Sequence, residues 1–356
     1  MSGKTNRLLV AASGTGGHLF PALAVAEALS DYEIEWLGVP NRLESQLVPE
    51  CYPLNTVEVE GFQQGLSFRT IKITLGLIAA VFQVRRLIKK KQIDVIFTTG
   101  GYIAAPAILA ALLEKKPAIL HESNFIPGKV TRFLSKYCSA IAIGFEGTSQ
   151  YLPHVTTKYV STPVRSQFLS PQSLDLPMPQ DALLIVVVGG SQGAVAVNNL
   201  VRQAAPKWLE QGAYVVHLTG TRDPEVNSLE HPHYIALPFY DNMAGLLQRA
   251  DLAISRAGAG TLTELAITET PAILIPYPYA AEDHQTYNAK VFSDAGAAVV
   301  YQQSGLTPEI LESQVTEWLQ QPDKLSQMSI QAKSLAMIDS GEKVAKLISH
   351  QLTVNS

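Results

Sequence analysis

The sequence predicts an α/β protein made of two Rossmann-like domains, each a doubly wound parallel sheet. Three observations predict this fold class. Short apolar runs alternate with helical stretches throughout the first half of the chain. A stretch rich in proline and poor in periodic apolar residues follows at 161–180. After it, the chain begins again with a strand, a glycine loop and a helix, which indicates two similar halves.

The segment Arg7–Leu29 is the opening unit of the first half. Residues 8–12 form an apolar run suited to a strand buried on both faces, and a helix follows with Pro21 in its first turn. Between them, three of the four positions 14–17 are glycine. The loop amides and the helix N-terminus favour negative charge. The unit therefore predicts a site for an anionic or polar group at the carboxyl edge of the sheet.

This first loop does not match two common nucleotide motifs. Leu19 stands where the dinucleotide fingerprint requires glycine, and the strand Glu33–Val39 ends without the acidic residue that would hold a ribose. His18 stands where the phosphate loop of NTPases requires lysine. Two interpretations stay open for this loop alone: a ligand site of another kind, or a tight turn that binds nothing.

Two further predicted strands of the first half end in glycine or polar clusters. Gly100-Gly101 follow one strand and open a helix, and residues 121–124, His-Glu-Ser-Asn, follow the next. Polar residues often simply end strands, but three clusters on one sheet edge favour a site. The predicted strands of this half are Arg7–Ala12, Glu33–Val39, Leu54–Glu60, Ile93–Thr98, Ala118–His121 and Ala140–Ile143.

The second half repeats the pattern after the proline-rich stretch. Its glycine loop, residues 189–193, carries Ser191, and the loop amides with this hydroxyl can hold a phosphate at the N-terminus of the next helix. Residues 306–351 are predicted to be helical. The predicted strands are residues 183–188, 214–219, 234–237, 252–255, 272–275 and 298–301.

Two more loops of the second half carry candidate side chains. Thr261 and Glu264 have the spacing of a capping box, so Glu264 either caps its own helix or binds a ligand, and the spacing alone favours the cap. Asp283 is predicted as a helix N-cap, whereas Gln285 has no evident helical role. Arg165, in the predicted linker, is either a solvated charge or a fork-shaped phosphate ligand.

Composition excludes several classes of function. Hydrophobic residues make up 47% of the chain and charged residues 16%, which predicts large buried cores, and the net charge of −4 gives no sign of nucleic-acid binding. Cys51 and Cys138 have no metal-type spacing. No signal peptide and no membrane-spanning run is expected. Since Asp-x-Asp is absent, we do not expect a metal-held nucleotide-sugar site of the single-domain kind. Helix N-termini, Ser191 and Arg165 would then stabilise a leaving diphosphate. No cofactor is expected.

Taken together, these motifs resemble the MurG family, GT-B glycosyltransferases of family 28. The resemblance rests on residues 14–24, 121–124, 163–165, 189–194, 258–264 and 285–289, whose order and spacing match over nearly the whole chain. It implies inverting transfer of N-acetylglucosamine from UDP-GlcNAc to lipid I, giving lipid II for peptidoglycan, and hence a role in cell shape and division. It also implies two domains that face a cleft: residues 1–162 with helix 340–356 for the acceptor, and 163–339 for the donor.

The resemblance also implies a set of substrate contacts. Asn124 would reach the transferred sugar, and Arg165 and Ser191 would face the diphosphate. Glu264 would take the ribose hydroxyls, which reverses the preference for a bare cap, and Gln285 would take sugar hydroxyls. Tyr240, with Phe239, would lie at the uracil. The remaining contacts expected on the loops are Thr15, Gly16, Gly17, Ala259, Gly260, Thr261, Leu262 and Thr263.

A base is needed to take the proton of the acceptor hydroxyl, and the first-half edge offers His18 and Glu122. His18 is favoured as base or acceptor anchor, and Glu122 as its orienting partner or as the base itself. The segment Arg69–Lys91 has Ile71, Leu75, Ile78 and Phe82 at helical spacing, followed by Arg85, Arg86, Lys89, Lys90 and Lys91. It is either an ordinary crossover helix or, given a lipid-linked acceptor, a peripheral contact with the cytoplasmic face of an anionic inner membrane.

Three other functions are weighed against this one. A synthase that glycosylates diacylglycerol would share the donor and the membrane. A UDP-GlcNAc epimerase shares the fold but needs no acceptor and usually has paired carboxylates in its cleft. A non-catalytic partner subunit is disfavoured, because glycine loops occur in both halves.

Overall fold

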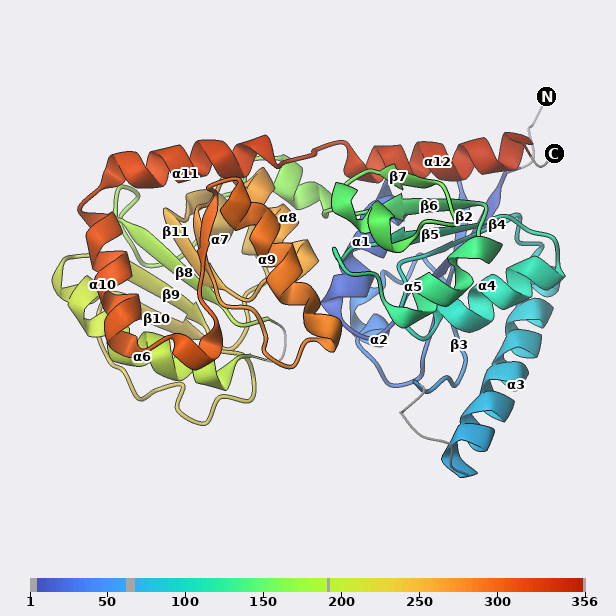
Figure 1. Cartoon of the computed structure of the whole chain (residues 1–356), viewed down its shortest axis with the longest axis horizontal. Coiled ribbons are helices and arrows are strands. Elements are labelled where there is room, and N and C mark those ends of the chain that lie inside the picture. The colour runs from blue at the N-terminus through green and yellow to red at the C-terminus, as the bar shows by residue number, and fades with distance from the viewer. Residues whose placement is uncertain (1–4, 62–67, 191–192, 355–356) are drawn as a thin grey trace. The chain divides into compact units, whose positions relative to one another are not determined.

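The computed structural model describes residues 5–61, 68–190 and 193–354. The chain divides into two compact units (Figure 1). The first unit comprises Met1–Arg165 together with Asp339–Ser356, and the second comprises Ser166–Ile338. The predicted boundaries were 162/163 and 339/340. Each unit is an α/β layer structure in its own right, so the two are described separately.

The first unit is built on a parallel sheet with the strand order β3-β2-β1-β4-β5-β6-β7. All pairings described in it are parallel, from Arg7 opposite Glu33 to Ile143 opposite Tyr159. This confirms the predicted fold class. The strands are β1 (Arg7–Ala11), β2 (Glu33–Gly38), β3 (Leu54–Thr56), β4 (Val95–Thr98), β5 (Ala118–Glu122), β6 (Ala140–Ile143) and β7 (Thr157–Tyr159).

Helices cover both faces of this first sheet. Alternate residues of a strand point to opposite sides, and here both sets are apolar and must be buried. On β1, Leu8 and Val10 join one core cluster, while Leu9 and Ala11 join another. The helices of the unit are α1 (Gly16–Glu27), α2 (Glu44–Leu47), α3 (Phe68–Lys91), α4 (Ala104–Leu113), α5 (Lys129–Leu134) and α12 (Ser340–Val354), with short 3-10 turns η1 (Ser135–Tyr137) and η2 (Glu146–Tyr151).

Helix α12, the last of the chain, completes the core on the α1 side of this sheet. Its buried Val344, Ala345 and Ile348 share a cluster with Leu19 and Val25 of α1. Figure 1 shows the red α12 lying over the same unit as the blue β1 and β2. The first unit therefore contains both the beginning and the end of the described chain.

The second unit repeats the architecture with the strand order β10-β9-β8-β11-β12-β13, again parallel in every described pairing. Its strands are β8 (Leu184–Val188), β9 (Tyr214–Leu218), β10 (Tyr234–Leu237), β11 (Leu252–Ser255), β12 (Ala272–Leu274) and β13 (Ala298–Val300). Its helices are α6 (Val195–Glu210), α7 (Met243–Arg249), α8 (Ala259–Ile267), α9 (His284–Asp294), α10 (Pro308–Leu319) and α11 (Pro322–Ser334), with 3-10 turns η3 (Ser166–Leu169), η4 (Ala281–Asp283) and η5 (Gln303–Gly305).

The sequence-based prediction differs from the structure at three places in the fold. The strand predicted at Leu54–Glu60 ends at Thr56. Strand β7 was not predicted, since its three residues include Thr157 and Lys158 and form no apolar run. The helical region predicted at 306–351 is three helices. Pro308 and Pro322 each stand at the start of a helix, where the missing N–H costs nothing. Both sheets reverse their strand order beside the first strand of the unit, at β1/β4 and at β8/β11, where ligands of open α/β sheets bind.

Candidate functional site

In the first unit, the carboxyl ends of β1, β4 and β5 bring His18 and Glu122 into one connected group. A β-carbon added to Gly101 would lie 3.4 Å from His18 Nε2, and one added to Gly100 would lie 3.9 Å from Thr131 Oγ1. Thr131 in turn donates to Glu122 Oε2 over 2.7 Å. Gly100 and Gly101 have φ of +89° and +72°, which favours glycine at both positions. The glycine pair therefore gives the imidazole room beside the strand end.

The ring of His18 is held in one tautomer. Its Nδ1 lies 2.8 Å from the carbonyl oxygen of Thr99, and a carbonyl only accepts, so Nδ1 carries the proton. Thr99 also donates its hydroxyl to the His18 carbonyl over 2.9 Å. This pair of bonds fixes the ring, and in the neutral form of the ring the lone pair is on Nε2. A neutral imidazole with an oriented Nε2 is the form that a general base requires.

Glu122 is buried, and its carboxylate accepts several hydrogen bonds. Oε2 accepts from the Thr131 hydroxyl and from the Gly128 amide at 3.0 Å, just before α5. Oε1 accepts from the Asn124 amide at 3.1 Å and from the Asn124 side chain at 3.4 Å. The carboxylate thus shapes the turn that presents Asn124 and the start of α5. No hydrogen bond between Glu122 and His18 is found among the described residues.

The loop of Thr15, Gly16 and Gly17 lies at the start of α1. Thr15 is the N-cap residue, and its side chain makes no capping hydrogen bond. A β-carbon at Gly16 would lie 2.7 Å from the ring of Phe20, and the guanidinium of Arg165 lies 4.1 Å from the centre of the same ring. Arg165 is therefore stacked beside the start of α1, as a cation over an aromatic face.

Sequence reasoning missed Glu44, which organises this same loop. Only 1% of its surface is exposed. Its carboxylate accepts from the Ser13 hydroxyl at 2.5 Å, the Val39 amide at 2.7 Å and the Gly14 amide at 3.2 Å. Such a buried acceptor ties the end of β2 to the loop after β1. In the sequence Glu44 resembles any acidic residue in the first turn of a helix, so no signal pointed to it.

The second unit places its predicted loops along the carboxyl edge of β8, β10, β11 and β12. Gly190 and Gly193 have φ of +91° and +76°, as a tight strand-to-helix turn requires. Ser191, predicted at the diphosphate, lies outside the described residues. Tyr240 and the 59% exposed Phe239 follow β10 at the sheet edge. Burial, and then the charge of Asp175, raise the pKa of Tyr240.

The predicted capping box at the second loop is wrong. Helix α8 begins at Ala259 with Gly258 as its N-cap, so Thr261 lies inside the first turn instead of capping it. Ala259, Gly260 and Thr261 are the first three helical residues, and their amides lack intrahelical partners. Glu264 stands on the second turn, half-buried. The first turn of α8 is therefore a second helix N-terminus able to meet an anion.

Gln285 joins two of these loops. Its Oε1 accepts from the Ala257 amide at 3.2 Å, before α8, and from the Tyr277 amide at 2.9 Å, after β12. Because the oxygen is used in this way, the amide Nε2 is the atom suited to donate to a ligand. Asp283 takes the predicted N-cap position of α9, although its side chain makes no backbone capping bond.

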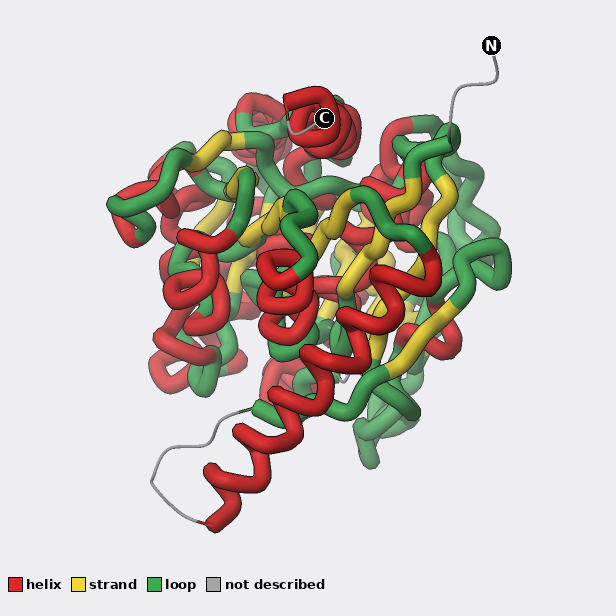
Figure 2. Tube along the Cα trace, turned by 90° about the vertical axis from the view of Figure 1, so that its right-hand side faces the viewer, coloured by secondary structure: helices red, strands yellow, loops and turns green. Residues whose placement is uncertain are grey.

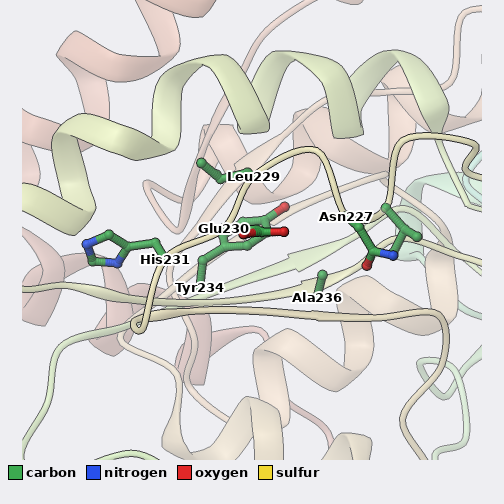
Figure 3. Close-up of a pocket in the computed structure, with 7 residues that line it drawn as sticks. Asn227, Leu229, Glu230, His231, Tyr234 and Ala236 are labelled. Carbon is green, nitrogen blue, oxygen red and sulfur yellow. The ribbon is translucent and has the colours of Figure 1, made fainter.

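Two hollows lie away from these residues. One of about 400 Å³ is bordered by the loop after β9 and by β10, including Asn227, Glu230, His231 and Tyr234 (Figure 3). The other, about 150 Å³, lies along α3 beside Tyr102. Neither is lined by a residue predicted for the site. Among the described residues, no group of three or more His, Cys, Asp or Glu is placed to hold a metal ion.

Comparison with known proteins gives the same family for both units. The N-terminal domain model of glycosyltransferase family 28 matches residues 8–143, and its C-terminal domain model matches residues 184–348. The UDP-N-acetylglucosamine–N-acetylmuramyl-(pentapeptide) pyrophosphoryl-undecaprenol N-acetylglucosamine transferase of Gloeothece citriformis is 70% identical, covering 96% of this chain and 95% of the relative. The enzyme of the same name from Crocosphaera subtropica is 66% identical, covering 96% and 98%.

This chain is also similar to a solved structure of the same family. The crystal structure of MurG from Acinetobacter baumannii superposes with a TM-score of 0.79 and 32% sequence identity. The match covers 97% of this chain and 99% of the other.

Proposed function

The chain belongs to glycosyltransferase family 28, and from this membership we infer that it transfers N-acetylglucosamine from UDP-GlcNAc to lipid I, giving lipid II. The observation that carries this inference is the match over nearly the whole length of relatives named for this reaction, in both units. The acceptor hydroxyl attacks the anomeric carbon of the α-linked sugar, its proton goes to a base, and UDP leaves. A single displacement of this kind inverts the anomeric centre.

We assign the donor to the second unit, with Arg165, the last residue of the first unit before the second begins, as a further contact that the resemblance implies. The N-termini of α6 and α8 and the side chains of Ser191 and Arg165 would meet the diphosphate, where their partial or full positive charge offsets the charge that develops on the leaving group. The donor residues assigned are Arg165, Ser191, Tyr240, Ala259, Gly260, Thr261, Leu262, Thr263, Glu264 and Gln285. The proposal is supported by the start of α8 at Ala259 and by the orientation of the Gln285 amide.

Within this assignment, the ribose, the sugar and the uracil of the donor are each bound by one named side chain. Glu264, half-buried on the second turn of α8, would accept from the ribose hydroxyls, as the resemblance implies. Gln285 would donate Nε2–H to a sugar hydroxyl. Tyr240 would pack on the uracil.

We assign the acceptor to the first unit and the base to His18. Its Nδ1–H bond to Thr99 supports this choice, because it leaves Nε2 to accept the proton of the acceptor hydroxyl. The hydrogen bonds to Glu122 favour a shaping role for that carboxylate over a role as base. Thr15, Gly16, Gly17 and Asn124 would line the sugar side of the same edge.

We also propose that α3 holds the enzyme at the cytoplasmic face of an anionic membrane. Leu75, Ile78 and Phe82 are 62%, 49% and 52% exposed, whereas Val81 and Val84 on the other face are buried. Figure 2 shows α3 running out beyond the body of the first unit. None of the described helices is long and apolar enough to cross a bilayer. The predicted apolar position Ile71 has a side chain outside those described.

The basic end of α3 contributes less charge than its sequence suggests. Arg85 and Lys89 pair with Glu114, and Lys91 pairs with Glu35 at 2.7 Å. Arg86 and Lys90 are exposed. Since a basic residue near an anionic surface contributes about 1 kcal/mol, these two should supply most of the attraction.

Two experiments test the proposal. Purified protein is incubated with radiolabelled UDP-GlcNAc and either lipid I or diacylglycerol, and labelled lipid II is the expected product. Label on diacylglycerol identifies a glycolipid synthase, and an epimerised nucleotide sugar without any acceptor identifies an epimerase. For the membrane, changing Arg86 and Lys90 to Gln should weaken binding to anionic vesicles, while changing the exposed Lys290 and Lys346 of other helices should not. Equal binding by both pairs would contradict the α3 assignment.

A further inference from the structure

A chain of buried polar side chains lies beside the glycine loop of the second unit, and the catalytic scheme above does not use it. Its members come from α6, β9, the loop after β9 and β10, and none exposes more than 9% of its surface. Buried polar groups are costly unless each is hydrogen-bonded, so a fully satisfied group of this size calls for an explanation. The members are Asn198, Arg202, His217, Asp223 and Tyr234.

The hydrogen bonds of this cluster allow one arrangement of protons. Asn198 donates both Nδ2 hydrogens, to the Thr219 carbonyl at 2.8 Å and to Asp223 Oδ2 at 2.6 Å. Its Oδ1 must then accept from His217 Nε2 at 3.1 Å. His217 Nδ1 therefore accepts from the Tyr234 hydroxyl at 2.6 Å. The histidine is neutral in this arrangement, and burial lowers its pKa to about 3.

Arg202 and Asp223 form the charged end of the cluster. Its guanidinium donates to both oxygens of Asp223, at 2.7 Å and 3.2 Å, and the Glu225 amide donates to Asp223 Oδ1 at 3.0 Å. Burial acts to raise the pKa of Asp223, but the bonds from Arg202, Glu225 and Asn198 outweigh it, so the pKa is lowered. A bidentate pair of this kind fixes direction as well as distance.

The cluster contacts the glycine loop through the end of β9. A β-carbon at Gly193 would lie 2.4 Å from the Thr219 carbonyl oxygen and 3.2 Å from the Gly220 Cα. The loop backbone is thus packed against the carbonyl that Asn198 holds. Asn198 is also in the first turn of α6, where its amide donates to the Ala194 carbonyl at 2.8 Å. One side chain therefore links the start of α6 to the strand end that supports the loop.

We propose that Asn198, His217, Asp223, Arg202 and Tyr234 are positioning residues for the diphosphate of the nucleotide-sugar donor. They hold the Thr219 carbonyl, Gly193 and the start of α6 in register, so that the amides in the first turn of α6 point at the phosphates before the ligand arrives. This inference rests on the proposed function, which puts the diphosphate at the N-terminus of α6. The cluster holds the start of α6 directly through Asn198, whereas it reaches the end of β10 only through Tyr234 and through Thr219, whose amide donates to the Leu237 carbonyl at 2.9 Å. We therefore expect a larger effect on the diphosphate than on the uracil or ribose.

The test compares UDP with uridine, which lacks both phosphates, as inhibitors of N-acetylglucosamine transfer to lipid I. Asn198→Ala removes the bond to Thr219, and Tyr234→Phe removes only the far end of the chain of bonds. Thr270→Val serves as the control, since Thr270 is also buried and donates to the Leu247 carbonyl at 2.9 Å, before β12, which lies on the other side of β8 from β9 and β10. All variants are made in the full chain.

We expect Asn198→Ala to raise the inhibition constant of UDP by about tenfold or more and that of uridine by less than about twofold. Tyr234→Phe should raise the UDP value by about threefold, and Thr270→Val should change neither value. Unchanged values, or equal increases for UDP and uridine, would overturn the inference. If Asn198→Ala does not fold, Tyr234→Phe replaces it in the test: its inhibition constant should rise more for UDP than for uridine. A wild-type protein without transfer activity would instead refute the proposed function and the inference built on it.

Discussion

Replacing His18 tests the central chemical assignment. His18→Asn keeps a donor, because the asparagine Nδ2–H can replace Nδ1–H toward the Thr99 carbonyl, but it removes the Nε2 lone pair. His18→Ala removes both. Comparing the two variants separates the loss of the base from the loss of the bond that orients the ring.

The structure gives different magnitudes for these two losses. The bond from His18 Nδ1 to Thr99 is a half-buried, neutral hydrogen bond, so its removal should cost about 0.5–1.5 kcal/mol of stability. The bond from the Thr99 hydroxyl to the His18 carbonyl involves the backbone and survives both substitutions. Loss of a general base lowers turnover by about 10²–10⁴-fold. His18→Asn should therefore lose turnover to about the same extent as His18→Ala while keeping more stability.

The assay is turnover at saturating lipid I and UDP-GlcNAc, with the affinity for UDP measured by calorimetry. Both variants should bind UDP as the wild type does, since the donor is assigned to the other unit. Near-normal turnover of His18→Ala would refute His18 as the base, and Glu122 or another group at that edge would take the role. Glu122→Gln serves as the matched variant: its loss of turnover should come with a loss of stability, because the carboxylate holds the turn before α5.

Three further predictions concern other carboxylates and the buried histidine. Glu264→Gln should raise the KM for UDP-GlcNAc with little change in the melting temperature, because Gln keeps the size of the side chain but cannot offer two acceptors to the ribose hydroxyls; a lower melting temperature with the same KM would exclude ribose binding. Glu44→Ala should lower the free energy of unfolding by about 2–4 kcal/mol in a denaturant titration, since one buried and two partly buried donors lose their acceptor, and a loss under about 1 kcal/mol would contradict this. The pKa of His217 falls from about 6.5 unfolded to about 3 folded, so its contribution is present above pH 6.5 and is lost as the pH falls toward 3. Relative to His217→Asn, the wild type should thus lose about 2–3 kcal/mol by pH 4.5 in urea titrations, and parallel pH profiles would be inconsistent with a buried neutral histidine.

The strands that carry the fold were predictable because they are buried on both faces. Leu184–Val188 and Arg7–Ala11 are continuous apolar runs followed by glycine, and such runs have few alternatives to a central parallel strand. The edge strand β7 has no such run, and the pairing of its backbone with β6 alone defines it. Sequence patterns therefore indicate the centre of a sheet better than its edge.

The helix starts were less predictable, because spacing does not fix register. Thr261 and Glu264 have capping-box spacing, yet the chain turns into α8 at Gly258, three residues before Thr261. The loop that ends in Gly258 is held by Gln285, whose oxygen bonds the Ala257 amide from another loop. That tertiary contact has no local signature in the sequence.

The roles of buried carboxylates were the least predictable part of the site. Glu122 was predicted from its place at a strand end, but its hydrogen bonds come from residues 124, 128 and 131, which only the folded turn brings together. Glu44 was not predicted at all, since its partners are 5 to 31 positions away. The strand-end position pointed to Glu122, and nothing in the sequence pointed to Glu44.

The packing of α12 on α1 has a consequence for how the protein is made. Val344, Ala345 and Ile348 are part of the core that also buries Leu19 and Val25. This core of the first unit is therefore incomplete until α12 has left the ribosome. The whole of Ser166–Ile338 is synthesised in between. Domains generally fold as units during synthesis, so the inserted unit can reach its final structure while the nascent first unit still exposes the apolar face of α1. The unit whose synthesis begins first is therefore completed last, and during translation this face is the surface where a chaperone would be needed.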